Sequence, residues 1–426
     1  MADFDSGKDL ARAGHALDTT NFFLADVRDG LGPYLAIYLL TEQKWDEASI
    51  GVVMSLATIA GIVAQTPAGA LVDATRAKRL VMISAAIVVT AASLLLPLMT
   101  SFWPVAISQS IAYAAGVIFA PAIAAVSLGI VGAKAFTARV GRNETFNHAG
   151  NTVGAVIAGA AAYALGPSAV FYLMAVTSAG SLISVLAIPE RAIDHDVARG
   201  LAHQAEGNRP KRGEQPSGLS ILLTCRPLLI FAVCVALFHL ANAAMLPLVG
   251  QKLALQDKNL GTSLMSACIA AAQLVMVPMA LLVGVRADRW GHKRFFLTAL
   301  LILPLRAVLY TLSDDKAWLV GVQLLDGVGA GIFGAIMPVI VADLTRGTGR
   351  FNIAQGAVIT VQSIGAALST ALAGLVVVHS GYNAAFLVLG AAAALAVIVC
   401  WLLLPETGGA EAAHPNAAPS PAIPAE

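Results

Sequence analysis

Hydrophobic residues occur in twelve long runs along the chain, separated by short polar segments. Each run is about 18–25 residues long, which is the length an α-helix needs to cross the hydrocarbon core of a bilayer. The pattern therefore predicts an all-α membrane protein with twelve transmembrane helices. The predicted spans lie near residues 21–40, 50–71, 79–100, 103–131, 143–165 and 168–188 in the first half, and near 228–249, 260–284, 295–312, 317–342, 352–379 and 383–404 in the second.

The composition agrees with this pattern, because only 12% of the residues are charged and 58% are hydrophobic. An ordinary soluble domain is about 25% charged, so this chain needs a bilayer as its solvent. The net charge of +1 gives no indication of nucleic-acid binding. We expect neither an enzyme nor a cofactor, because no ATP-binding or catalytic motif occurs. The cysteines show no metal or disulfide spacing and lie at Cys225, Cys234, Cys268 and Cys400.

Lys and Arg are distributed unequally between the two ends of the predicted helices. With both termini in the cytoplasm, the cytoplasmic segments hold 20 of the 26 basic residues and the outer loops hold four. This positive-inside bias predicts cytoplasmic termini. The expected organisation is a cytoplasmic N-terminus (1–20), a six-helix bundle (21–190), a cytoplasmic linker (191–226), a second six-helix bundle (227–405) and a disordered cytoplasmic tail (406–426).

A motif of glycine, aspartate and basic residues occurs twice, with the copies 215 residues apart. Other matches at nearly the same offset, such as Pro189-Glu190 with Pro405-Glu406, indicate a duplicated six-helix unit. The two bundles are therefore expected to be pseudo-symmetric. The nearly complete copy consists of Gly284, Asp288, Arg289, Gly291, Lys293 and Arg294, and the degraded copy of Gly69, Asp73, Arg76, Lys78 and Arg79.

The repeated motif, Gly-x-x-x-Asp-Arg-x-Gly-x-Lys-Arg in its second copy, resembles the signature of the major facilitator superfamily of secondary transporters. The Pro-Glu after the sixth and twelfth spans is similar to that family's half-ending motif. The resemblance implies that the motif residues form a cytoplasmic gate, in which the Asp and its basic neighbours tie the two halves together. Asp73 and Asp288 each precede a helix and are also placed to cap backbone N–H groups. Gln109 stands in span four, where many members carry an Arg, and span five lacks the Gly-Pro of the drug exporters.

Three ionisable residues in the first span are candidates for function. Asp26, Arg28 and Asp29 lie inside an apolar helix, where a charge costs about 2.5–3.5 kcal/mol unless it is paired or wet. In one interpretation Arg28 binds a substrate carboxylate or phosphate while Asp26 or Asp29 takes up a proton. In the other, Arg28 pairs with another helix and the cluster lies at the membrane interface. The helix-breaking Gly30, Gly32 and Pro33 favour the first.

Polar residues in four other spans are further candidates. Amide side chains there either line the substrate path or join helices by hydrogen bonds. Asp326 and His148 are candidates for proton coupling, and an Arg306–Asp326 ion pair is the structural alternative for Asp326. The predicted substrate-binding residues, besides Arg28, are Asn147, Asn151, Asn242, Gln355 and Gln362.

The sequence as a whole predicts a gradient-driven, proton-coupled secondary transporter of a small organic solute that works by alternating access. Export by proton antiport is the leading prediction, and Arg28 favours an anionic or carboxylate-bearing solute such as a siderophore or organic acid. Proton-symport uptake, multidrug efflux and a transport-inactive receptor or scaffold are the alternatives. We expect a monomer in a bacterial inner membrane, with the solute, protons and lipid as partners and no nucleic acid or metal.

Overall fold

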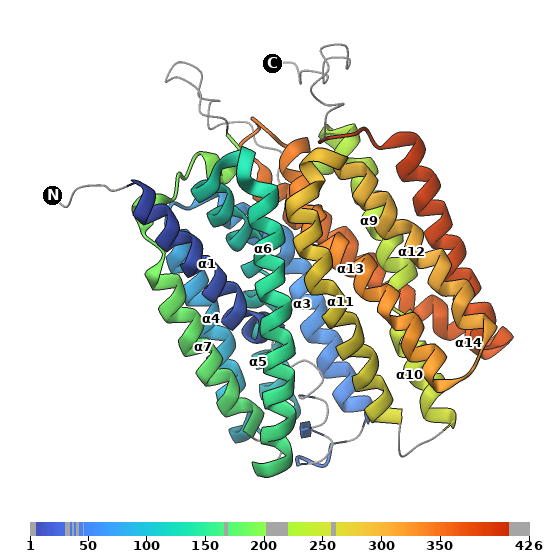
Figure 1. Ribbon diagram of the computed structural model, residues 1–426. Helices are drawn as coiled ribbons and strands as arrows, with labels where there is room; N and C mark the ends of the chain where they lie inside the picture. Colours follow the sequence, from blue (N-terminus) through green and yellow to red (C-terminus); the bar gives the residue numbers. More distant parts are fainter. Residues whose placement is uncertain are drawn as a thin grey trace.

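The computed structural model of the chain describes residues 6–29, 35, 38–39, 42–45, 47–165, 169–201, 220–256 and 261–408, and these are almost entirely helical (Figure 1). The long helices are α1 (Ser6–Asp29), α3 (Glu47–Ala74), α4 (Lys78–Leu95), α5 (Phe102–Gly116), α6 (Phe119–Leu165), α7 (Ala169–Ala187), α9 (Arg226–Asn242), α10 (Met245–Gln256), α11 (Gly261–Trp290), α12 (His292–Leu312), α13 (Lys316–Leu344) and α14 (Phe351–Leu403). The short ones are η1 (Leu96–Leu98), η2 (Glu190–Ala192), η3 (Val197–Arg199) and α8 (Ser220–Thr224).

Two continuous helical stretches, α5 with α6 and α14, are long enough to cross the bilayer twice, and each turns at a glycine. The helical stretches 102–158 and 351–403 are 57 and 53 residues long, which is about twice the length that one crossing needs. Gly132 in α6 and Gly381 in α14 have φ values of 69° and 79°. Since only glycine adopts such angles without strain, each turn occurs where the sequence supplies one. Counted in this way, with α5 and the first part of α6 as one span and α9 and α10 as another, the helices correspond to the twelve predicted spans.

The first span differs from its predicted position. Helix α1 begins at Ser6 rather than near residue 21, and its first half carries Asp9, Arg12 and Asp18. The helix packs against α6 and α7, and Asp18 is only 3% exposed. A charged residue that is paired inside the bundle does not interrupt a helix, and hydropathy alone does not reveal such pairing.

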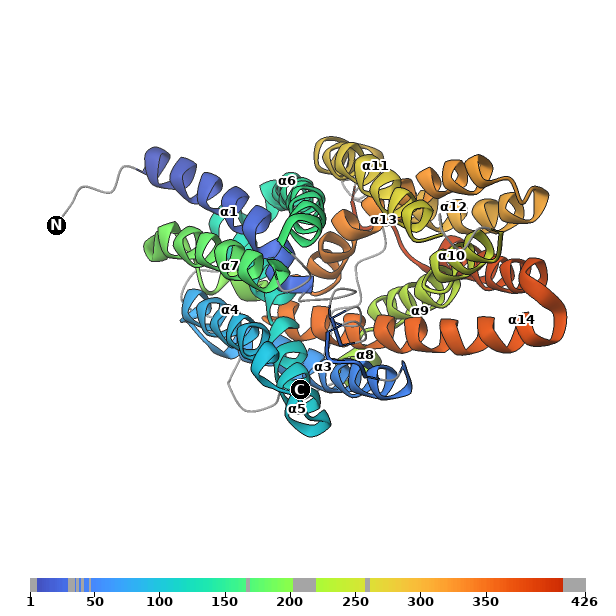
Figure 2. The ribbon, with the colours of Figure 1, turned by 90° about the horizontal axis from the view of Figure 1, so that it is seen from below.

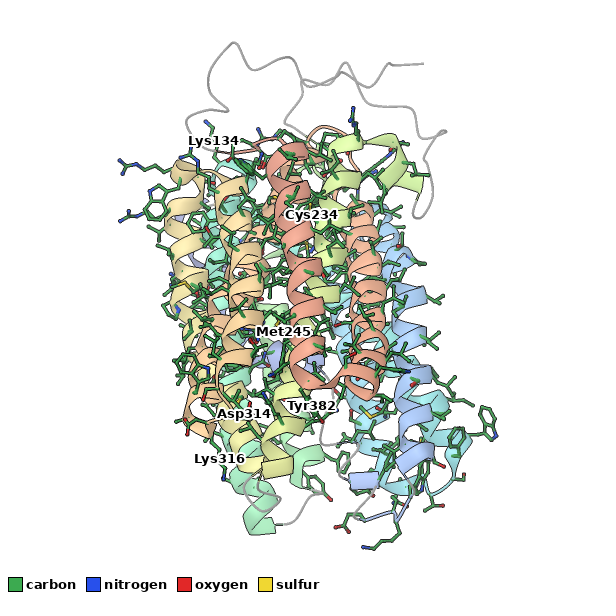
Figure 3. All side chains as sticks on the ribbon, turned by 90° about the vertical axis from the view of Figure 1, so that its right-hand side faces the viewer. Lys134, Cys234, Met245, Asp314, Lys316 and Tyr382 are labelled. Atoms are coloured by element: carbon green, nitrogen blue, oxygen red, sulfur yellow. The ribbon has the colours of Figure 1, made fainter. Side chains whose placement is uncertain are left out.

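The helices form two groups, one containing α1 and α3–α7 and the other α9–α14 (Figure 2). Between the groups α3 packs against α14 and α6 packs against α11. The first residue of α1 and the last of α14 lie at the same end of the molecule, which we name the terminal side (Figure 1). Lys134 lies at this side, whereas Asp314 and Lys316 lie at the opposite side (Figure 3).

The outward faces of the helices are apolar. Val63 is 70% exposed, Val285 74% and Val378 82%, and many other large hydrophobic residues share this position. A water-soluble protein rarely exposes such a continuous apolar surface. The outer surface is therefore suited to contact with lipid chains.

Helices α3 and α14 cross with their backbones in contact. A Cβ atom at Gly356 of α14 would lie 2.6 Å from the carbonyl oxygen of Gln65, and one at Gly69 of α3 would overlap the carbonyl of Asn352. Beside these glycines the Oγ1 atoms of Thr66 and Thr360 lie 2.9 Å apart. Small residues at a crossing let membrane helices approach closely and gain packing energy.

Helices α6 and α11 form a second crossing of the same kind. A Cβ at Gly141 would lie 2.6 Å from the Cα of Gly284 and equally close to the carbonyl oxygen of Ala280. Gly69 with Gly284, and Gly141 with Gly356, are each separated by 215 residues, the offset of the repeated motif. The two crossings, which we call the glycine seams, are thus related by the internal duplication.

The buried apolar residues are arranged differently at the two sides of the molecule. At the terminal side one cluster spans both halves, and in it the rings of Phe136 and Phe351 make an edge-to-face contact with centroids 5.8 Å apart. Toward the opposite side each half has its own cluster, one around Phe171 and one around Tyr310. In the described residues, therefore, the halves are packed together at the terminal side and separate into two cores at the other.

We expect Gly356→Ala to destabilise the protein by about 1–3 kcal/mol, because the added methyl group overpacks the α3–α14 seam. Gly374→Ala on the same helix is the matched control, since a Cβ there meets nothing within 4 Å. It should be neutral or slightly stabilising through helix propensity. Thermal unfolding of both variants in detergent measures the difference, and equal midpoints would show that the seam is not tightly packed.

Candidate functional site

A central cavity of about 390 Å³ lies between the two halves. Its volume is in the range of sites that bind small organic molecules. The N-terminal half contributes side chains from α1, α3, α4, α5 and α6, and the C-terminal half contributes side chains from α9, α13 and α14. The polar residues of the lining are Gln65, Ser93, Gln109, Tyr113, Asn143, Glu144, His239, Gln355 and Gln362.

Several amides of the lining have a free hydrogen-bonding atom. Gln109 and Gln355 are each only 3% exposed, yet Nε2 of the first and Oε1 of the second have no partner. Oε1 of Gln362 is also unpartnered. Two of the predicted substrate-binding residues, Gln355 and Gln362, thus reach the cavity from α14. Gln109, which the sequence marked as a departure from the family pattern, reaches it from α5.

The polar residues of α6 divide between the cavity and the seam. Asn143 and Glu144 line the cavity. Asn147 donates to Oε2 of Glu144 over 3.3 Å, and Asn151 is half-buried. His148 faces the other half, where its Nδ1 lies 2.9 Å from Oε1 of Gln273 on α11.

Asp73 of the first motif copy caps a helix in the other half. Its carboxylate accepts hydrogen bonds from Nδ2 of Asn352 over 2.7 Å and from the backbone N–H of Ile353 over 2.8 Å. These residues form the first turn of α14, where free N–H groups and the helix dipole favour a negative charge. The prediction of a cap was made for the helix that follows Asp73 in sequence, whereas the capped helix is α14 across the seam.

The basic residues of the first copy bind within their own half. Lys78 is fully buried and donates to the carbonyl oxygens of Val72 and Thr75, each over 2.8 Å, at the end of α3. Arg79 donates to the carbonyl oxygen of Leu186 on α7 over 2.8 Å. Arg76 is exposed. Among the described residues, Asp73 is therefore the member of this copy whose side chain forms hydrogen bonds with the other half.

The second copy is organised around His292. Its two ring nitrogens lie 3.0 Å from Oδ1 of Asp288 and 2.8 Å from Oδ2 of Asp343, so the ring links α11, α12 and α13. Asp288 is also hydrogen-bonded by Thr137 of α6, across the seam. Of the other motif residues, Gly291 has a φ of 98° at the α11–α12 turn, Lys293 donates to the carbonyl of Trp401, and Arg289 and Arg294 are exposed.

A buried ion cluster joins α1 to α6. Asp18 is paired with Arg139 and accepts hydrogen bonds from Nε and Nη2 of Arg142 over 2.9 and 2.6 Å. From Arg139 the chain of hydrogen bonds continues to Asn143 over 2.8 Å and from Asn143 to Ser127 over 2.8 Å. The cluster thus extends from Asp18 to the cavity lining. Sequence reasoning missed it because Asp18 was assigned to a polar N-terminal segment.

A second ion cluster lies inside the C-terminal half. Arg306 is 1% exposed and its Nη1 lies 2.6 Å from Oδ1 of Asp326 and 2.6 Å from Oδ1 of Asn242. Gln323 donates to the other oxygen of Asp326 over 2.9 Å. The structure therefore brings together the ion pair that was the structural alternative for Asp326, and Asn242 binds this pair instead of lining the cavity.

The charged candidates of the first span are described in their backbone only. Helix α1 extends through Asp26, Arg28 and Asp29, but the structure does not describe the side chains of these three residues. Their neighbour Val27 lines the cavity. The roles predicted for the three residues stay predictions.

Asp326→Asn should lower the free energy of unfolding by about 3–5 kcal/mol, because it leaves Arg306 as an unpaired buried charge. Replacing both partners by apolar residues, Arg306→Met with Asp326→Leu, should recover most of this loss. Thermal unfolding of the two variants checks the expectation. A single variant as stable as the parent would mean that Asp326 is not held as an ion-pair partner.

Comparison with known proteins agrees with this arrangement. Two uncharacterized MFS-type transporters of Mycobacterium tuberculosis, from strains CDC 1551 and H37Rv, are each 53% identical to the chain over 396 residues, which is 93% of this chain and 94% of theirs. The proton:xylose symporter XylE bound to 6-bromo-6-deoxy-D-glucose has a similar fold, with a TM-score of 0.68 and 14% identity over 95% of this chain and 97% of its own. The E. coli fucose:proton symporter FucP has a TM-score of 0.69 and 14% identity over 91% and 97%.

The family profile of the Major Facilitator Superfamily matches residues 17–303 and 231–425, which together cover both halves. The predictions of family, of an all-helical membrane fold with twelve spans in two bundles, and of a transporter instead of an enzyme are thereby confirmed. The chain belongs to the Major Facilitator Superfamily.

Proposed function

We propose that this transporter exports a small organic solute in exchange for protons, by alternating access to the central cavity. The observation that carries the proposal is a cavity of about 390 Å³ shared by both halves, beside which one apolar cluster of the described residues joins the halves at the terminal side. A cavity between two separable halves can be exposed to one side of the membrane at a time. The energy must come from a gradient, since the sequence has no ATP-binding motif.

Proton coupling is supported by ionisable groups near the cavity. Glu144 lines the cavity and His148 contacts the other half, so a proton on either would change charge or hydrogen bonding near the seam. Asp26 and Asp29 stay proposed as proton carriers on their sequence position. Asp326 is a weaker candidate than the sequence indicated, because Arg306 neutralises it.

The direction of transport and the solute follow from weaker observations. Proton-symport uptake is the second candidate, because the structural relatives XylE and FucP are described as proton symporters. The proposal of an anionic solute, such as a siderophore or organic acid, rests on Arg28. Multidrug efflux would need Arg28 to pair with another helix instead of binding the solute.

We further propose that the protein works as a monomer in the bacterial plasma membrane with the terminal side in the cytoplasm. The mycobacterial relatives support a bacterial plasma membrane, and the positive-inside bias supports that orientation.

Proton flux in vesicles tests the function directly. Purified protein is reconstituted with the pH dye pyranine inside, and outward gradients of ethidium, citrate and xylose are applied one at a time. We expect proton movement opposite to at least one solute gradient. Proton movement in the same direction as the solute would establish symport, and no proton movement with any solute would contradict proton-coupled transport of these classes.

Locking the seam should stop this flux. Thr66→Cys with Thr360→Cys places two thiols where the parent hydroxyls lie 2.9 Å apart, which suits a disulfide between neighbouring helices. Oxidation should lower solute-driven proton flux about tenfold, equivalent to about 1.4 kcal/mol, and dithiothreitol should restore it. Each single cysteine variant is the control for a disulfide that involves a native cysteine. Three of the four native cysteines are buried. Full flux in the oxidised double variant would show that the α3–α14 seam does not open during transport.

A further inference from the structure

The central cavity carries a negative charge in its described lining. Glu144 is the only acidic residue among the described lining residues, and neither Lys nor Arg is among them. The remaining polar groups are amides, hydroxyls and the imidazole of His239. Inside a membrane protein a carboxylate favours cations and disfavours anions, because the surrounding dielectric is low.

Glu144 is placed to meet a ligand. Its side chain is 19% exposed, and Oε2 accepts a hydrogen bond from Asn147 while lying 4.0 Å from Nε2 of His148. From the other half it is faced by Gly334, where an added Cβ would lie 3.7 Å from Oε2. A glycine opposite the carboxylate leaves space beside it. A charged group in the bilayer centre costs about 2.5–3.5 kcal/mol, so binding a proton or a cation there is favourable.

The unpartnered amides indicate what else the ligand carries. Gln109 belongs to the N-terminal half, and Gln355 and Gln362 belong to the C-terminal half. A buried polar atom without a partner costs about 1–3 kcal/mol. A ligand with hydrogen-bond donors and acceptors would satisfy these atoms from both halves at once.

We propose that the cavity binds a small organic cation, an amine that also carries hydrogen-bonding groups, with its charged nitrogen on the Glu144 carboxylate and its other polar groups on Gln109, Gln355 and Gln362. The proposal rests on the proposed function and names the solute class for the same cavity. The cation and a proton compete for Glu144, so only one is bound at a time. An exchange of one proton for one monovalent cation is then electroneutral.

Other titratable groups lie near Glu144. On its own helix His148 is adjacent, and across the cavity Tyr113 and His239 are the titratable residues of the described lining. The helices α11 and α13 present the neutral Gln273 and Gly334 on this face. The α1 side chains at 26, 28 and 29 lie outside the described residues, and the experiment therefore includes Arg28.

Equilibrium binding to the full-length protein in detergent tests the proposal. The probes are the cations ethidium, spermidine and choline, with carboxyfluorescein as the anionic probe. At least one cation should bind, and more tightly than carboxyfluorescein, because Glu144 attracts cations. Glu144→Gln should weaken cation binding about tenfold, equivalent to about 1.4 kcal/mol, while Glu144→Asp retains part of the affinity.

Several outcomes would overturn the proposal. These are no binding of any of the three cations, unchanged cation affinity in Glu144→Gln, or preferential binding of carboxyfluorescein that is lost in Arg28→Ala. The last would establish an anionic solute. Unchanged thermal unfolding of Glu144→Gln would show that the fold of this variant is intact. If the variant is destabilised, the double variant Gln109→Ala with Gln355→Ala tests the amide contacts in its place. Because binding needs no gradient, its failure is distinguishable from a failure of proton-coupled transport in vesicles.

Discussion

Backbone contact between helices of opposite halves is the constraint on which the rest of the structure depends. At the two glycine seams the α3 and α14 backbones, and the α6 and α11 backbones, approach so closely that a side chain does not fit at Gly69, Gly141 or Gly356. Close approach lets packing, instead of charge, hold helices together in lipid. It brings Asp73 to the first turn of α14 and places the amides of α14 opposite those of α3 and α5 around the cavity.

Strong and weak interactions are distributed unequally between the interior of each half and the seams. Two buried ion clusters, Asp18 with Arg139 and Asp326 with Arg306, join helices of the same half. Among the described residues the halves are joined across the seams by hydrogen bonds, such as Thr66 with Thr360, His148 with Gln273 and Asp73 with Asn352, instead of by a buried ion pair. Breaking a buried ion pair costs several times more than breaking a neutral hydrogen bond. Each half is therefore suited to move as a unit while the seams separate.

The sequence predicted the helix count and the duplication well, because both follow from apolar run length and from a repeated motif. It failed at the start of α1, where Asp18 is neutralised by Arg139 from a helix more than a hundred residues away. It assigned Asn242 to the substrate path, whereas Arg306 binds it. Tertiary packing decides which residues pair with each other and which polar residues of α6 face the cavity or the seam. The periodicity of a single helix carries no information about tertiary packing. Glu144 could have been singled out as the one acid among the amides of its span.

The central claim is that the halves move as units, opening the glycine seams at the terminal side while approaching each other at the opposite side. Distances between paired spin labels test it most directly, with one pair at Lys134 and Arg289 on the terminal side and another at Trp103 and Asp314 on the opposite side. As pH is changed, the account predicts that the terminal-side distance lengthens in the same fraction of molecules in which the opposite-side distance shortens. Two distances that stay fixed, or that lengthen together, would contradict it.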